Sequence, residues 1–253
     1  MASISAEEIF PPTPLPPDTY LTDSEVLEEA FGEKPLMDIQ IESSELDQPQ
    51  LRRLKELIYR FRLRWHPASA RMHPDNLPED TTRCTFNLTQ PPNWTPARLK
   101  PTNPQARETT MEMIRKKLDM GIIQRSSSPY TSSVLLVPKG GGQFRFVVNY
   151  TGLNAITKVE GFHISRVDEA LSLFNGKTFF TSFDMKDAFW SLPVQASDRH
   201  LTAFLAPDGS VYEYLYMPQG IKNGSSIFSK FLYHVLRELR FSVCVCFIDD
   251  LFI

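Results

Sequence analysis

The decisive stretch of this chain is Phe241-Ser-Val-Cys-Val-Cys-Phe-Ile-Asp249-Asp250-Leu-Phe-Ile253. Its apolar, β-branched and aromatic residues predict a buried strand, and two adjacent carboxylates interrupt the run where a hairpin would turn. Two neighbouring anions repel each other, so their position beside a buried strand needs an explanation. Either they form an acidic hairpin tip in water, because Asp favours turns, or they bind a divalent cation that offsets the repulsion.

A second aromatic stretch, Thr178-Phe-Phe-Thr-Ser-Phe-Asp184-Met-Lys-Asp187-Ala-Phe189-Trp190, also runs into a carboxylate. Its composition predicts a strand that ends at Asp184. Alone, Asp184 is a weak signal, but with the pair at positions 249 and 250 it would place oxygen ligands on both sides of hard cations. The two stretches therefore predict one shared site, provided that their strands converge in the fold.

A third motif consists of two apolar runs, Val134 to Lys139 and Gln143 to Tyr150, joined by Gly140-Gly-Gly142. The glycines predict a hairpin turn with Lys139 and Arg145 on either side of it. Such a hairpin can close over phosphate groups, because both cations bind phosphate oxygens. The Gly-x-x-x-x-Gly-Lys-Ser/Thr signature of P-loop proteins is absent, and composition alone leaves open that both cations are plain surface residues.

In combination, these motifs resemble the reverse transcriptases of retroviruses and of gypsy-type long-terminal-repeat retrotransposons. The palm of that family carries an aromatic-x-Asp-Asp box, here Phe247-Ile248-Asp249-Asp250, and an upstream Asp-x-x-x-Ala-aromatic segment, here Asp184 to Phe189. The glycine hairpin, with its continuation to Leu153-Asn154, is similar to the fingers of the family. Met217-Pro218-Gln219-Gly220 resembles its Pro-Gln-Gly segment.

The resemblance implies an enzyme, an RNA-directed DNA polymerase that transfers a nucleotide from a dNTP to a primer 3′-hydroxyl. It implies that Asp184 and Asp249, assisted by Asp250, hold two Mg²⁺ ions, for which Mn²⁺ is an alternative. One ion would activate the primer hydroxyl, and the other would neutralise the leaving pyrophosphate. No metal role follows for Asp187, which we expect to be an acid at the entry of a helix.

The resemblance also implies the nucleotide contacts. Lys139 and Arg145 are expected to bind the triphosphate, and Gln219 is expected near the nucleotide sugar and the template. Phe189 takes the place of the steric gate, an aromatic ring that would collide with a ribose 2′-hydroxyl, so we expect a preference for deoxynucleotides. From residue type alone, Phe189 is equally well a core aromatic.

The predicted fold class is α+β, with the fingers and a partial palm of a right-hand polymerase and an antiparallel sheet packed on helices. Residues 1–48 are predicted to be an acidic, Pro-rich disordered leader, residues 49–100 a basic helix and linker, and residues 101–253 the fingers and partial palm, without a thumb. Within that last part the family usually has Asp and Arg where this chain has Asn149 and Thr151, so no contacts are assigned there.

Periodicity and capping residues predict the individual elements. A helix should begin near Pro104, capped by Thr102 or Asn103, and stop at Gly121. Further predicted elements are a basic amphipathic helix from Pro49, a strand at Thr82 to Leu88, a helix at Ser165 to Phe174, two strands from Leu201 to Tyr216, and a helix with the apolar stripe Ile227, Phe228, Phe231, Leu232, Val235, Leu236 and Leu239. We expect this stripe to pack against the sheet that bears the aspartates.

The charge of the chain is unevenly distributed. Residues 1–48 hold twelve acidic side chains and one basic one, so of the totals of 30 and 27 the rest of the chain keeps 18 acidic and 26 basic ones, a net charge of 26 − 18 = +8. A basic body suits a polyanionic partner, here an RNA or DNA template-primer.

Cys84, Cys244 and Cys246 lack metal-ligand spacing, and the last two alternate with valines, which indicates small core residues rather than a zinc site. The sequence shows no signal peptide and no apolar run near the roughly 20 residues that span a bilayer. We therefore expect an intracellular protein, located in the cytoplasm, in virus-like particles or in the nucleus.

Two other functional classes stay open. A truncated, non-catalytic remnant of a retroelement polymerase would bind nucleic acid without incorporating nucleotides, and an unrelated hydrolase would surround Asp184 with sugar-stacking aromatics. Because Leu251 to Ile253 lie inside the predicted second hairpin strand, we expect a free edge strand there. We also expect the 253-residue chain alone to extend primers poorly or not at all, with an oligomer or other polyprotein segments as further partners.

Overall fold

The computed structural model describes residues 47–50, 52–53, 73–77, 79, 81–99, 103–162, 174–176, 180–185, 187–239, 244–248 and 250–253. The chain forms two compact units, Met1–Ala70 and Arg71–Ile253. In the first unit a helix begins after Asp47, whose N–H donates to Gln50 Oε1 at 3.0 Å while Gln50 N–H donates to Asp47 Oδ1 at 2.8 Å. With this reciprocal cap the helix begins at Gln48, one residue before Pro49, where the basic helix was expected to start. The rest of that helix, residues 1–46 of the predicted leader, and nearly all of the helix predicted at Ser165 to Phe174 lie outside the described residues.

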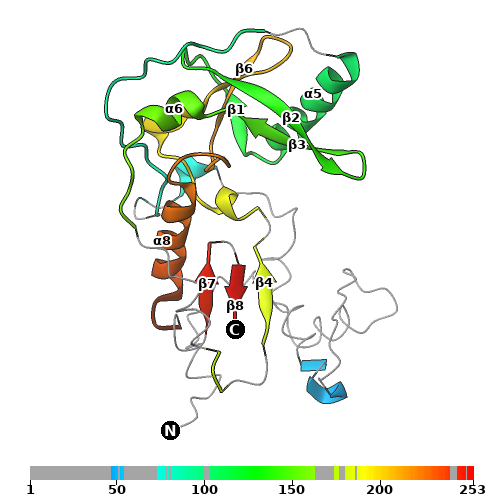
Figure 1. The fold of residues 1–253 in the computed structure, drawn as a ribbon, viewed down its shortest axis with the longest axis vertical. Helices are drawn as coiled ribbons and strands as arrows, with labels where there is room; N and C mark the ends of the chain where they lie inside the picture. The colour runs from blue at the N-terminus through cyan, green and yellow to red at the C-terminus, as the bar shows by residue number, and fades with distance from the viewer. Residues whose placement is uncertain are drawn as a thin grey trace. The chain divides into compact units, whose positions relative to one another are not determined.

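The second unit contains two sheets with helices packed on them (Figure 1). In chain order its elements, with η for a 3₁₀ helix, are η2 (Pro74–Asn76), α5 (Pro104–Asp119), β1 (Ile123–Arg125), β2 (Ser132–Gly140), β3 (Gln143–Val148), α6 (Thr151–Ile156), β4 (Ser182–Asp184), η3 (Ala188–Ser191), η4 (Ala196–Thr202), β5 (Phe204–Leu205), β6 (Val211–Tyr214), α8 (Gly224–Leu236), η5 (Arg237–Leu239), β7 (Val245–Phe247) and β8 (Asp250–Phe252).

Helix α5 begins and ends where the sequence predicts. The Asn103 side chain accepts a hydrogen bond from Gln105 N–H at 2.9 Å, and Pro104 occupies the first helical position, where its missing N–H costs nothing. Beyond the last turn Gly121 adopts a φ of +64°, a conformation that glycine reaches without steric cost.

The larger sheet has five strands in the order β1-β6-β5-β2-β3. Its β2–β3 and β5–β6 pairs are the two predicted hairpins, but β2 and β5 run parallel, so the sheet is mixed rather than purely antiparallel. The strand expected from Leu201 begins only at Phe204, because residues up to Thr202 form η4. There Thr202 Oγ1 donates to Arg199 O at 2.7 Å and accepts from Tyr214 N–H at 2.8 Å, and these bonds stabilise the turn.

The smaller sheet has three strands in the order β4-β8-β7. The last strand of the chain, β8, is therefore the central strand, and the predicted free edge at this position is wrong. Beyond the ladder, Thr181 N–H donates to Ile253 O at 2.8 Å and Ile253 N–H donates to Thr181 O at 2.9 Å. The hydrogen-bonding groups of β8 are thus satisfied on both sides by β4 and β7.

Helix α8 packs against β7 and η3, as expected for the helix that covers the sheet with the aspartates. Ile227, Phe228 and Leu232 of its predicted stripe are buried, whereas Val235 is 54% exposed. Cys244 and Cys246 are buried, which confirms that they are core residues, and Cys84 is buried as well. In the described ranges no helix combines the length and the apolar character needed to cross a membrane.

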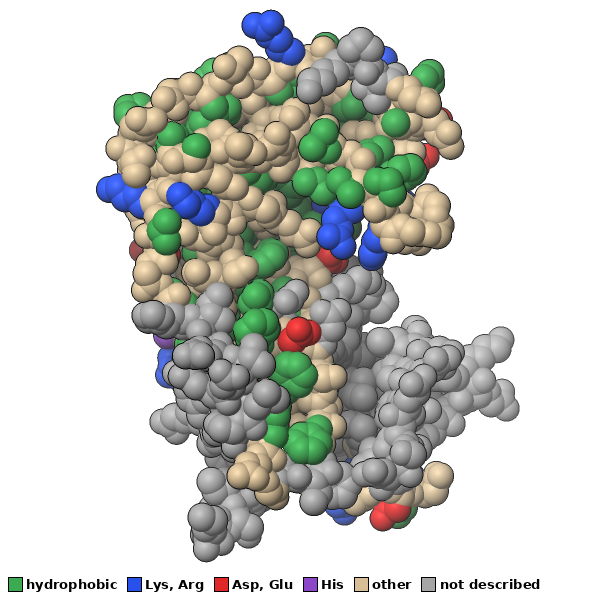
Figure 2. Space-filling view, in the orientation of Figure 1, with side chains coloured by type: hydrophobic (Ala, Val, Ile, Leu, Met, Phe, Trp, Pro, Cys, Tyr) green, Lys and Arg blue, Asp and Glu red, His purple; other side chains and the backbone are tan. Residues whose placement is uncertain are grey.

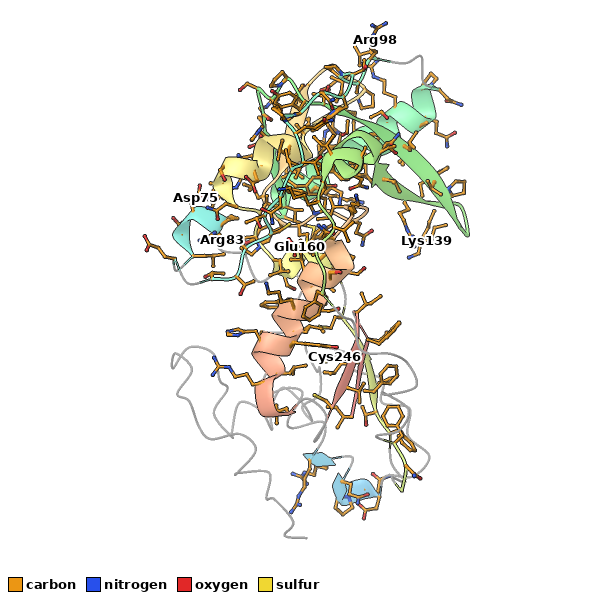
Figure 3. The ribbon with its side chains drawn as sticks, turned by 60° about the vertical axis from the view of Figure 1, so that its left-hand side comes forward. Asp75, Arg83, Arg98, Lys139, Glu160 and Cys246 are labelled. Carbon is orange, nitrogen blue, oxygen red and sulfur yellow. The ribbon has the colours of Figure 1, made fainter. Side chains whose placement is uncertain are left out.

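The segment before α5 is extended but forms only single bridges, Cys84 with Val194 and Leu88 with Thr157, rather than the predicted strand. Backbone bonds, among them Cys84 N–H to Pro193 O at 2.8 Å and Thr89 N–H to Ile156 O at 2.7 Å, join it to the rest of the second unit, and side chains add further contacts. Asp75 Oδ1 lies 2.6 Å from Nη2 of the buried Arg199, and Arg83 Nη1 donates to Pro74 O at 3.0 Å (Figure 3). The hydrogen bond from Arg199 lowers the pKa of the Asp75 carboxyl group below its ordinary value.

We expect Asp75→Asn to lower the free energy of unfolding by about 1 kcal/mol at pH 7, since a hydrogen bond to a charged group contributes more than this but Asp75 is largely exposed. Because the folded-state pKa of Asp75 is lowered, its contribution is complete above about pH 4 and disappears as the pH falls further. Urea unfolding of both proteins at pH 7 and pH 3 measures this. An equal difference in unfolding free energy at the two pH values would contradict it.

Candidate active site

The two acidic motifs meet in the smaller sheet. Across the β4–β8 pair Asp184 lies opposite Asp250, and across β7–β8 Phe247 lies opposite Asp250, so the hairpin turns between Phe247 and Asp250. Directly opposed residues of antiparallel strands have Cα atoms about 4.5–5.5 Å apart. The structure thus brings Asp184 and Asp250 together as predicted. Asp249 and the side chain of Asp184 lie outside what the structure describes.

The tip of this hairpin carries an unusual backbone conformation. Ile248 has a φ of +57°, a left-handed conformation that is rare for a β-branched residue. Such conformations cost about 1–3 kcal/mol and persist where the surrounding structure imposes them. The turn before the acidic pair is therefore held in a defined conformation.

The glycine hairpin presents the two predicted phosphate-binding cations. Gly140, Gly141 and Gly142 all have positive φ, which lets β2 and β3 reverse direction there. Both Lys139, on β2 beside the turn, and Arg145, opposite Val137 on β3, are exposed, and Figure 3 shows Lys139 near the end of the hairpin. Neither side chain is buried in the core, so both can reach a ligand.

An apolar surface accompanies Arg145. Because side chains alternate along a strand, Leu135, Val137, Arg145 and Val147 share one face of the β2–β3 hairpin. Leu135 is 48% exposed and Val137 is 44% exposed, and Figure 2 shows hydrophobic side chains gathered over this hairpin. A guanidinium group beside exposed apolar side chains is suited to stacking against nucleobases.

The segment after β4 turns sharply. Asp187 has a φ of +54° and begins η3, with Trp190 N–H donating to Asp187 O at 2.9 Å. Asp187 thus stands at a helix entry, as expected. Phe189 is half-buried and meets Phe228 of α8 edge to face, with ring centroids 5.6 Å apart. Phe189 therefore contacts the core while part of its surface remains exposed.

The loop that carries Gln219 is held by Asn154 of α6. Met217 and Pro218 are buried, whereas Gln219 and Gly220 are exposed. Asn154 Nδ2 donates to Gly220 O at 2.9 Å, and Asn154 Oδ1 accepts from Lys222 N–H at 2.8 Å. The sequence showed Asn154 only as part of a family pattern, since nothing local indicates a contact 66 residues away.

The family resemblance implies dNTP binding, and we expect Asn154→Ala to weaken this binding about tenfold, because two hydrogen bonds that fix the Gln219 loop are lost, at about 0.5–1.5 kcal/mol each. Equilibrium binding of a fluorescent dNTP measures the change. Asn76→Ala, an exposed residue of η2, is the matched control and should leave the affinity unchanged. Identical affinities for the Asn154 variant and the unmodified chain would exclude this role.

A comparison with known protein families points to the part of the chain that carries these residues. Residues 137–253 match the family model described as reverse transcriptase (RNA-dependent DNA polymerase). This segment belongs to the reverse transcriptase family. The resemblance predicted from the acidic motifs and the hairpin is confirmed.

Relatives of this reverse transcriptase segment are retroelement polyproteins. The chain is 36% identical over 155 residues to the enzymatic polyprotein of cauliflower mosaic virus (strain Strasbourg), an alignment that covers 60% of this chain and 22% of that protein. It is 33% identical over 187 residues to the transposon Tf2-3 polyprotein of Schizosaccharomyces pombe, covering 73% of this chain and 14% of the polyprotein. The chain therefore spans less than a quarter of the length of these relatives.

Solved structures show the same fold. The foamy viral protease-reverse transcriptase in complex with an RNA/DNA hybrid aligns with a TM-score of 0.66 at 18% identity, covering 91% of this chain and 28% of that one. The native prototype foamy virus protease-reverse transcriptase aligns with a TM-score of 0.65 at 22% identity, covering 95% and 30%. The predicted α+β polymerase fold is confirmed, with the corrections to the sheets described above.

The donor set at the acidic site fits a hard divalent cation. Carboxylate oxygens are the ligands that such cations prefer, and the β4–β8 register brings two aspartates to adjacent backbone positions. Among the described residues, no group of three or more His, Cys, Asp or Glu side chains is placed to hold a metal ion. Asp249 and the side chain of Asp184 do not belong to the described part. The reverse transcriptase family uses divalent metal ions, and the particular ion remains part of the proposal below.

Proposed function

We propose that this chain supplies the catalytic and nucleotide-binding residues of an RNA-directed DNA polymerase, which transfers nucleotides from dNTPs to a primer 3′-hydroxyl. The observation that carries the proposal is the antiparallel register that places Asp184 opposite Asp250 at the tip of the Phe-Ile-Asp-Asp hairpin. Two adjacent carboxylates repel each other, and a bound cation removes that cost.

In this proposal Asp184, Asp249 and Asp250 hold Mg²⁺, with Mn²⁺ as an alternative, and the metal supplies charge neutralisation at the transferred phosphate. The side chains of the chain position the other reactants. Phosphoryl transfer needs positioned charges more than covalent chemistry from the protein, so exposed cations and carboxylates are sufficient components.

The nucleotide would lie between the β2–β3 hairpin and the turn that follows β4. Lys139 and Arg145 bind its triphosphate, while Gln219, held through Asn154, faces its sugar and the template. Phe189 excludes a ribose 2′-hydroxyl, because its ring is fixed against Phe228 and cannot easily move aside. Together these residues select deoxynucleotides.

The partner is an RNA or DNA template-primer. Support comes from the net charge of +8 outside the acidic first 48 residues, 26 basic against 18 acidic side chains, and from the foamy viral relative described in complex with an RNA/DNA hybrid. The exposed apolar side chains of Leu135 and Val137 offer a contact surface for template bases. An intracellular site of action, in the cytoplasm, in virus-like particles or in the nucleus, and further polyprotein segments complete the proposal.

Primer extension on an RNA template tests the function. The 253-residue chain and the same chain followed by the segment that succeeds the matching region in the cauliflower mosaic virus polyprotein are both assayed with Mg²⁺ and with EDTA. We expect incorporation of dNTPs that EDTA abolishes, stronger in the extended protein. Template binding without any incorporation in either protein would favour the alternative of a non-catalytic nucleic-acid-binding remnant.

A further inference from the structure

An unusual lysine lies where four elements of the second unit meet. Lys117 projects from α5, and its Nζ lies 4.0 Å from the ring centroid of Trp190, 5.4 Å from that of Phe146 and 5.9 Å from that of Tyr214. These rings belong to η3, β3 and β6, respectively. The ammonium group of this half-buried lysine thus lies close to three aromatic rings.

The two nearest rings adjoin the proposed nucleotide contacts. Phe146 follows Arg145 on β3, and Trp190 follows Phe189 on η3. A cation between these rings is attracted to both faces, by about 0.5–2 kcal/mol at each favourable site. Lys117 therefore connects the strand that carries the triphosphate cation to the turn that carries the steric gate.

Resting on the proposed function, we infer that Lys117 is a positioning residue of the nucleotide site, which fixes Phe189 relative to Arg145 through the rings of Trp190 and Phe146. Lys117 itself touches neither nucleotide nor metal in this inference. Its role is to keep the distance between the β2–β3 hairpin and the Phe189 ring suited to a deoxyribose.

The effect of the Lys117 charge on folding distinguishes a positioning role from a purely stabilising one. Burial lowers the pKa of Lys117 from 10.5 to about 8, although the Asp187 carboxylate acts in the opposite direction. The unfolded chain keeps the Lys117 proton up to about pH 10.5, whereas the folded chain loses it near pH 8. The free energy of unfolding therefore rises with pH between 8 and 10.5, and below pH 8 the charge of Lys117 opposes folding. A residue that only stabilised the core would not need this charge.

The test uses the 253-residue chain with template-primer and Mg²⁺. Lys117→Met gives an unbranched side chain one atom shorter and removes the charge. Lys117→Arg keeps a charge that stacks on rings, and Lys116→Met changes the exposed neighbour on α5. Equilibrium binding of dATP and of ATP is measured for each protein, together with the melting temperature.

We expect Lys117→Met to weaken dATP binding about fivefold and to narrow the preference for dATP over ATP by a similar factor, with a melting temperature equal to or above that of the unmodified chain. Lys117→Arg should retain most of the preference, and Lys116→Met all of it. An unchanged preference in a folded Lys117→Met protein, or a preference lost equally in Lys116→Met, overturns the inference while the proposed function stands. If the unmodified chain binds no dNTP, the proposed function fails and the inference fails with it.

A second measurement examines the aromatic enclosure independently of nucleotides. In protein labelled with ¹³C-lysine, ring currents should shift one ε-methylene signal well upfield of the others, and that signal should be absent from Lys117→Met. Lysine signals without such a shift would show that Nζ does not lie over Trp190 and would also overturn the inference.

Discussion

Asp184→Asn is expected to reduce metal-dependent nucleotide incorporation by about 10³-fold or more, the scale seen when one member of a catalytic group is removed. Asparagine keeps the size of the side chain but loses the negative charge that attracts the cation. The rate of single-nucleotide incorporation, measured with template-primer in the extended protein at saturating Mg²⁺, gives the change directly.

Asp208→Asn is the matched control, because Asp208 lies in the exposed turn between β5 and β6 and its carboxylate accepts only local bonds from Ser210 N–H and Oγ among the described contacts. This variant should incorporate nucleotides at the unmodified rate. The Asp184 variant should still bind template-primer, since basic residues carry that interaction. Equal rates for Asp184→Asn and the unmodified protein would remove Asp184 from the mechanism.

Gly152→Ala is expected to lower the free energy of unfolding by about 2 kcal/mol. An added Cβ at this position would lie 2.6 Å from Cβ and 2.7 Å from Cγ of Trp94, atoms close to the backbone that cannot easily move. Such overpacking costs up to about 3 kcal/mol, whereas alanine gains about 1 kcal/mol over glycine in a helix. The steric cost therefore exceeds the gain, and urea unfolding measures the difference.

Gly161→Ala provides the comparison, because no heavy atom lies within 4 Å of an added Cβ there and its φ is not in the left-handed region. Its effect on unfolding should be small or slightly stabilising. Placing Gly152→Ala in a Trp94→Gly background should cost much less than in the unmodified chain, since both clashing atoms of Trp94, Cβ and Cγ, are then absent. A full cost in that background would show that Trp94 is not the cause. Because α6 also carries Asn154, the same substitution should weaken dNTP binding.

Local sequence signals accounted for the elements that depend on neighbouring residues. Asn103, Pro104 and Gly121 define both ends of α5 through side-chain capping and backbone conformation within a single turn. Three consecutive glycines define the β2–β3 hairpin for the same reason. The acidic pair at positions 249 and 250 was recognisable because carboxylates interrupt an apolar run.

Local signals failed where distant segments compete for the same backbone groups. Leu201 and Thr202 have strand-forming neighbours, yet the bonds of Thr202 to Arg199 and Tyr214 favour a 3₁₀ turn. The end of the chain was predicted to be a free edge, but β4 pairs with β8 and makes it the central strand. Strand order cannot be read from composition, since a strand has the same pattern at a central or an edge position.

By itself the sequence determined which residues are candidates for the proposed chemistry: acids at two strand ends, cations beside a glycine turn and an aromatic residue predicted to act as a gate. Only the tertiary structure decided which of them meet. It placed Asp184 opposite Asp250, joined Asn154 to Gly220, and enclosed Lys117 between three rings. The physical reason is that caps and turns are satisfied within a few residues, whereas register and side-chain enclosure arise from packing between segments that have no local pattern in common.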